Sequence, residues 1–125
     1  LVGNLKHEND EVRARAAAAL GRMGPPGRSA GDALRAALAK DLHWPVRALA
    51  ARSLARLEGP EAVPVLIEAL HDPTQEVRNA VAEALGEIGP PAKDALPALR
   101  QAMLPLNGRE AAYQAIRKIE GETDK

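Results

Sequence analysis

Three histidines are the side chains of this 125-residue chain best suited to metal or proton chemistry, since the chain contains no cysteine. His7, His43 and His71 each fall in a turn between predicted helices, but at different positions in their turns. Imidazole nitrogens are common zinc ligands. Because packed helices lie about 8–10 Å apart, histidines of successive turns are expected to be too distant to share one ion. The sequence therefore predicts solvated histidines, no metal site and no cofactor.

Nucleophilic and phosphate-binding motifs are also missing. Ser53 lies between Arg52 and Leu54 without the glycines of a nucleophile elbow, and we place it on the outward side of a helix. The GPPG turn at 24–27 lacks the Lys-Ser/Thr ending of a phosphate loop, and its prolines remove amide donors. We therefore expect no catalytic residues and no enzymatic activity in this chain.

The stretch 72–91, DPTQEVRNAVAEALGEIGPP, is the unit that the rest of the chain repeats. Asp72 before Pro73 predicts a helix start, and Gly89 before two prolines predicts its end. Between them, apolar residues recur at the spacing of one helix face: Val77, Val81, Ala82, Leu85 and Ile88. A single helix cannot bury such a stripe alone, so it needs neighbours of the same kind.

Copies of this helix occur 31 and 65 residues earlier and 34 residues later, and a second copied element lies between them. The pattern predicts seven helices, near 10–23, 29–39, 44–57, 61–71, 74–88, 94–104 and 108–120, with an N-terminal stub at 1–6. A repeat in the low thirties built from helix pairs indicates a solenoid. We predict one all-α domain, a right-handed α-solenoid. It divides into a half repeat at 1–9, full repeats at 10–40, 41–71 and 72–106, a capping helix at 107–121 and a tail at 122–125.

The repeat resembles the short HEAT-like repeat of phycobilisome lyase subunits, which reads D-x4-V-R-x2-A-A-x-A-L-G-x-I-G followed by A-V-P-x-L-x3-L. The segments 72–89 and 62–70 match it almost throughout. The resemblance implies the fold across nearly the whole chain, but such repeats serve many functions. The related deoxyhypusine hydroxylases carry His-Glu iron ligands directly after V-R, and here those places hold Ala14-Arg15, Ala48-Leu49 and Asn79-Ala80. That activity is therefore not expected.

Charge is balanced overall but not along the chain. Residues 1–57 carry +5 and residues 58–125 carry −5, which could orient a polar partner or head-to-tail stacking. Arg47 and Arg78 each follow an aspartate, Asp41 and Asp72, by six residues, and this spacing predicts a ladder of Arg–Asp contacts between turns. On the outer face, exposed pairs are expected between Arg52 and Arg56 on one helix and Glu83 and Glu87 on the next.

Protein binding is the function that these features favour. The second helices of such solenoids line the concave side, which gives the candidate partner-binding residues Arg35, Ile67, Glu68, Arg100 and Gln101. Ile67 between two arginines is a plausible contact centre. Trp44, at a helix start, is either an exposed anchor or a plug over Pro73. Nucleic acid is disfavoured because basic residues are scattered and stacking aromatics are nearly absent.

Two functions remain open at this point: a non-catalytic interaction or scaffold module, and an accessory part of an enzyme such as a phycobilin lyase-like protein with its chemistry elsewhere. The chain begins within a repeat, so we expect it to be a fragment of a larger HEAT-repeat protein. Its open N-terminal edge of Leu1, Val2 and Leu5 predicts self-association. No apolar run is long enough to insert in a membrane. No motif identifies a compartment, although the cytoplasm is favoured.

Overall fold

The computed structural model describes residues 2–23, 28–102 and 109–121. Expectations that concern Leu1, the turn at 24–27, the segment 103–108 and the tail at 122–125 lie outside these residues. Within them the chain forms seven α-helices and no β-strand. The predicted all-α class is therefore confirmed.

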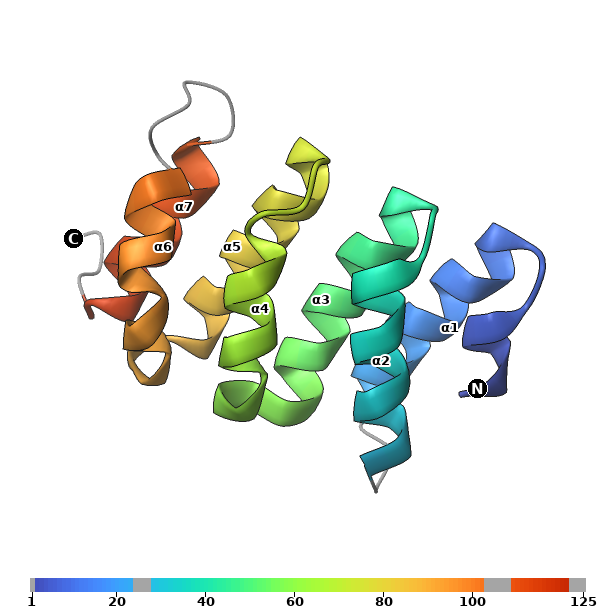
Figure 1. Cartoon of the computed structure of the whole chain (residues 1–125). Helices are drawn as coiled ribbons and strands as arrows, with labels where there is room; N and C mark the ends of the chain where they lie inside the picture. The colour runs from blue at the N-terminus through green and yellow to red at the C-terminus, as the bar shows by residue number, and fades with distance from the viewer. Residues whose placement is uncertain (1, 24–27, 103–108, 122–125) are drawn as a thin grey trace.

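The helices form a solenoid of two layers, and Figure 1 shows the helix pairs following one another in chain order. One layer contains the first helices of the pairs, which are α1 (Asp10–Met23), α3 (Trp44–Glu58), α5 (Gln75–Ile88) and α7 (Arg109–Ile119). The other contains the second helices, α2 (Arg28–Lys40), α4 (Val63–Ala69) and α6 (Leu96–Ala102). Each second helix packs against the first helix that follows it in the chain.

Three 3₁₀ turns occupy the predicted N-terminal stub and the predicted starts of two helices. They are η1 (Gly3–Lys6), η2 (Gly59–Ala62) and η3 (Pro90–Ala95). Helices α4 and α6 begin later than expected because η2 and η3 precede them, and their prolines, Pro64 and Pro97, each occupy the second helical position. Proline is tolerated only in the first turn, where no intrahelical N–H bond is lost. These prolines therefore define the start of both short helices.

The core is built from small residues in the first-helix layer and leucines between the layers. Close backbone contacts run from α1 through α3 and α5 to α7, whereas α2 and α4 meet over only a short stretch. Alanine at equivalent buried positions allows the first helices to approach closely: Ala17, Ala51 and Ala82. The leucines that fill the space between the layers are fully buried: Leu20, Leu34, Leu54, Leu66, Leu85 and Leu99.

Ser53 corrects one expectation. Its side chain is buried, and its Oγ donates a hydrogen bond of 2.5 Å to the backbone oxygen of Ala17 on α1. Ser53 stands three residues after Ala50 and one before Leu54, so it belongs to the buried stripe rather than to the outward side. Gly21 lies at the same contact, where a Cβ would come within 2.7 Å of the Ser53 Cα. Helices α1 and α3 are thus in backbone contact at this point.

Substitution of Gly21 with valine is expected to lower the free energy of unfolding by about 1–3 kcal/mol, because the added carbons force α1 and α3 apart. Circular dichroism during urea unfolding measures the change. Gly3→Ala is the control: a Cβ there meets nothing within 4 Å, and the effect should stay within about 0.5 kcal/mol. Equal stability of Gly21→Val and the unmodified chain would contradict the close packing.

Candidate protein-binding surface and the arginine ladder

The turns that precede α1, α3 and α5 share one hydrogen-bonding pattern. In two of them an aspartate carboxylate accepts a hydrogen bond from the backbone N–H two residues later. Asp41 accepts from His43 and Asp72 accepts from Thr74, both at 2.9 Å. In the first turn His7 occupies the aligned position, and its Nδ1 accepts the N–H of Asn9 at 3.0 Å. Asp72 was expected to cap α5 directly; instead Thr74 is the residue before the helix, and Asp72 stabilises the turn.

One arginine per repeat connects these turns, and we call Arg13, Arg47 and Arg78 the arginine ladder. Each donates from Nη1 to the backbone oxygen of the residue six positions earlier, which is His7, Asp41 or Asp72. Arg13 and Arg47 also reach forward to the aspartate of the next turn. Their Nε and Nη2 atoms bind the Asp41 and Asp72 carboxylates as a fork, at 2.8–3.2 Å for Asp41 and 2.9–3.1 Å for Asp72. The predicted ladder is therefore confirmed, with each fork crossing to the following repeat.

The ladder ion pairs are largely removed from solvent. The side chains of Arg47 and Asp72 are 12% and 9% exposed, and Thr74 Oγ1 accepts a further bond from Arg47. In the first pair, the hydrogen bond to Asp41 and the nearby charges of Asp41 and Asp10 raise the pKa of Arg13 above its ordinary value, against the opposing effect of burial. These arginines are therefore structural cations that hold the turns in register.

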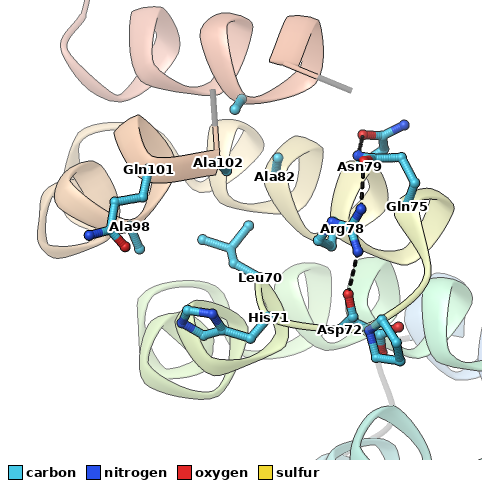
Figure 2. Close-up of a pocket in the computed structure, with 12 residues that line it drawn as sticks. Leu70, His71, Asp72, Gln75, Arg78, Asn79, Ala82, Ala98, Gln101 and Ala102 are labelled. Carbon is cyan, nitrogen blue, oxygen red and sulfur yellow. Dashed lines mark hydrogen bonds between the residues drawn. The ribbon is translucent and has the colours of Figure 1, made fainter. Parts of the chain in front are cut away.

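Arg78 differs from the other two. It keeps the bond to the Asp72 backbone oxygen, at 2.6 Å, but its Nη2 donates to Gln75 Oε1, also at 2.6 Å, rather than to a carboxylate. Gln75 in turn donates to Asn79 Oδ1 at 2.8 Å. This side chain lines a pocket of about 520 Å³ together with residues of the turn after α4, of α6 and of α7; Figure 2 shows its surroundings.

The five candidate residues lie in one row of positions along the second helices α2, α4 and α6, which Figure 1 shows beside one another in one layer. Two of them are already paired within the chain. Arg35 Nη1 lies 2.9 Å from Glu58 Oε2 at the end of α3, and Arg100 Nη2 lies 2.9 Å from Glu120 Oε2 beyond α7. Both arginines therefore brace the two layers before any partner arrives.

The remaining three candidates face solvent to different degrees. Ile67 is half-buried against the core, whereas Glu68 and Gln101 are exposed. Hollows lie between successive members of this layer: one of about 550 Å³ between η1 and α2, one of about 260 Å³ between α2 and α4, and the pocket beside Arg78. Glu68 lines the second hollow and Gln101 the third. We call this row with its hollows the second-helix surface.

Trp44 is separated from the second-helix surface. It opens α3 in the other layer, is 41% exposed, and lines a hollow of about 430 Å³ with residues of α3 and α5. Pro73, which it was suggested to cover, lines other hollows. Trp44 thus belongs to the outer side of the solenoid and forms no common site with Ile67.

The outer side also contains the expected charge pair between first helices. Arg52 Nη2 lies 2.7 Å from Glu83 Oε1, and both side chains are about half exposed. Arg56 and Glu87 are exposed and form no ion pair with each other within the described residues. Of the expected charge pairs on the outer side, only Arg52 with Glu83 is therefore formed within the described residues. Exposed pairs of this kind contribute about 0–1 kcal/mol.

Other expectations fall on the turns and the N-terminal edge. His43 Nδ1 lies 3.5 Å from Asp10 Oδ2, and the described residues gather no three His, Asp or Glu side chains in a metal-binding cluster. Leu5 is buried and Val2 half-buried where η1 packs on α1, so self-association through this edge stays a prediction. No helix within the described ranges is long and apolar enough to cross a membrane.

The fold and its repeated turns define a solenoid of stacked helix pairs. The model of the family of HEAT repeats matches residues 31–120, and that of the PBS lyase HEAT-like repeat matches residues 12–40. The chain therefore belongs to the HEAT-repeat family. Among curated proteins, none matches its sequence.

A solved structure from the complex of CpcE and CpcF of phycocyanin lyase from Nostoc sp. PCC7120 is similar to this chain. The two share 32% sequence identity with a TM-score of 0.79, over 96% of this chain and 52% of that one. The present chain thus spans about half the length of that relative.

Proposed function

We propose that this chain is a protein-binding segment of a HEAT-repeat protein related to phycocyanin lyase subunits. The observation that carries the proposal is the 32% identity, over nearly all of this chain, to a chain from a complex of two proteins, CpcE and CpcF. The similarity favours the lyase-related alternative over a scaffold with no relation to an enzyme. In this proposal the segment supplies binding surface, and the chemistry of the whole protein is located elsewhere in the assembly.

The geometry of the polar side chains supports a binding role for this segment. Ser53, the hydroxyl considered as a nucleophile, is buried and donates to Ala17, so it is not available for attack on a substrate. The ladder arginines Arg13 and Arg47 are saturated by turn carbonyls and carboxylates. Such groups fix the frame on which surface residues are displayed.

The second-helix surface is the proposed contact region. Its apolar centre is Ile67, with Glu68 and Gln101 exposed beside hollows that a partner's side chains can enter. Protein interfaces combine an apolar centre with a polar rim, and arginine is favoured among the residues that contribute most. Because Arg35 and Arg100 are held by Glu58 and Glu120, they would meet a partner with little further loss of side-chain entropy.

Substitution of Ile67 with aspartate is expected to weaken partner binding at least about fivefold, or roughly 1 kcal/mol, because it places a charge at the apolar centre. The partner is recovered from an extract of the source cells with the whole protein as bait, and its affinity is measured calorimetrically. Glu87→Lys, on the exposed outer side, is the control and should bind normally. Loss of binding in Glu87→Lys with normal binding by Ile67→Asp would contradict the assignment, provided circular dichroism confirms that both variants are folded.

A further inference from the structure

The third position of the arginine ladder has a guanidinium but no carboxylate among the described residues. At Arg47, all three guanidinium nitrogens donate to oxygen atoms of Asp41, Asp72 or Thr74. At Arg78, Nη1 and Nη2 are bonded as described, and Nε has no acceptor within the described residues. Of the two nitrogens that bind a carboxylate as a fork in the preceding repeats, Nε is therefore left without a described acceptor at Arg78, and Nη2 donates to the neutral Gln75 amide.

Arg78 is one of the residues that line a pocket with an apolar wall. The lining of the 520 Å³ pocket includes Leu70 and four alanines, Ala82, Ala98, Ala102 and Ala112; Figure 2 labels all of these except Ala112. Pockets of about 300–1,000 Å³ with few polar groups are typical of small-molecule sites. An apolar body could thus be accommodated next to a fixed cation.

The charges around the pocket favour an anion. Arg78 is its only permanently cationic lining residue among those described, and Asp72 is its only acidic one. The Asp72 carboxylate already accepts Arg47 and the Thr74 N–H, so only its backbone oxygen faces Arg78. Gln75 Oε1 accepts a hydrogen bond from the guanidinium, and Gln75 in turn donates to Asn79, so both neighbours are neutral. Arg78 therefore forms no ion pair with a carboxylate of the described residues.

We propose that Arg78 and this pocket bind a carboxylate group carried on an apolar body, as Arg13 and Arg47 each bind an aspartate carboxylate. A planar guanidinium matches a carboxylate with two parallel hydrogen bonds, which a lysine ammonium cannot reproduce. The carboxylate belongs either to a small organic acid or to an acidic side chain of a bound protein. This pocket is one of the hollows of the second-helix surface and includes Gln101 in its lining, so the inference deepens the proposed function when the ligand is a partner's side chain; its test uses small probes and does not require the partner.

The ladder provides its own internal controls for a test by nuclear magnetic resonance. Nε–H resonances of the arginine side chains are followed while hexanoate is added to the whole protein, and the Arg78 signal is assigned from its loss in Arg78→Lys. We expect the Arg78 resonance to shift in a saturable manner. The Arg13 and Arg47 resonances should not shift, since their Nε atoms already bind carboxylates. Hexan-1-ol, with the same apolar body and no carboxylate, should leave all three unchanged.

A second arm distinguishes the source of the carboxylate. A terminally blocked alanine peptide with one glutamate is titrated in the same way. If this peptide shifts the Arg78 resonance and hexanoate does not, the ligand of the site is an acidic side chain of a partner protein. In Arg78→Lys, the affinity for whichever probe binds should fall at least about tenfold, measured on the ligand signals. If neither probe moves the Arg78 resonance, or if Arg13 and Arg47 shift equally, the proposal is wrong. This outcome is read from the unmodified protein, so it does not depend on the folding of a variant.

Discussion

Replacement of Asp72 with alanine is expected to lower the free energy of unfolding by about 3–5 kcal/mol, the cost of removing one partner of a buried ion pair. The Asp72 carboxylate accepts two bonds from Arg47 and one from the Thr74 N–H. Without it, Arg47 retains a charge in a position where its side chain is 12% exposed, and the turn before α5 loses its internal bond. Chemical unfolding followed by circular dichroism measures the loss.

Two further variants separate the ion pair from a general effect of charge removal. Asp94 is exposed, so Asp94→Ala should change the free energy of unfolding by no more than about 0.5 kcal/mol. The double variant Arg47→Met with Asp72→Leu should recover part of the loss, because no unpaired charge remains. A loss below about 1 kcal/mol in Asp72→Ala would mean that the ladder contributes little to stability.

Substitution of Leu54 with alanine is expected to destabilise the chain by about 2–5 kcal/mol. Leu54 lies on α3, near the middle of the solenoid, and is fully buried. Its removal leaves a cavity that the surrounding helices fill incompletely, since α1 and α5 are held against α3 by close contacts. The free energy of unfolding in urea, monitored by circular dichroism, is the measurement.

Leu42 is the matched control for this cavity. It is the same residue type in the turn before α3, but it is 96% exposed, so Leu42→Ala should have an effect within about 0.5 kcal/mol. Similar losses at the two positions would contradict the placement of the core between the two helix layers.

The apolar spacing was sufficient to predict the seven helices, because each helix must turn one stripe of Val, Ala and Leu toward its neighbours. The ends of the second helices could not be predicted as well. Pro64 and Pro97 stand in the first turns of α4 and α6, but the 3₁₀ turns before them depend on the path of the chain between layers. Ser53 was predicted on the outward side of its helix, but its spacing from Ala50 and Leu54 places it in the buried stripe.

The regular spacing of Arg and Asp predicted a ladder, but not its direction. Arg47 binds the Asp72 carboxylate of the next turn and also the Asp41 carbonyl. This arrangement follows from the stacking of turns in space, which a linear spacing does not specify. The different bonding of Arg78 had a signal in the sequence, since the position that aligns with the aspartate of the next turn holds Leu106. Pairing of Arg35 and Arg100 with Glu58 and Glu120 had no repeated spacing and was missed.

The choice of a binding surface requires more than the fold. Ile67, Glu68 and Gln101 lie in one aligned row, whereas Trp44 lies on the other layer next to α5. Two surfaces of the same solenoid are therefore available to a partner. Trp44 lies on the outer side, whereas the proposed contact region is the second-helix surface. An experiment that locates the partner directly is more decisive than further substitutions.

The central claim, that a partner protein binds the second-helix surface, is tested most directly by photochemical crosslinking. A photoreactive amino acid is placed at position 67 on α4 in one variant of the whole protein and at position 87 on α5 in another, and each is irradiated in an extract of the source cells. We expect a specific protein crosslinked from position 67 and absent from position 87. Crosslinking of the same protein from position 87 and not from position 67 would contradict the claim.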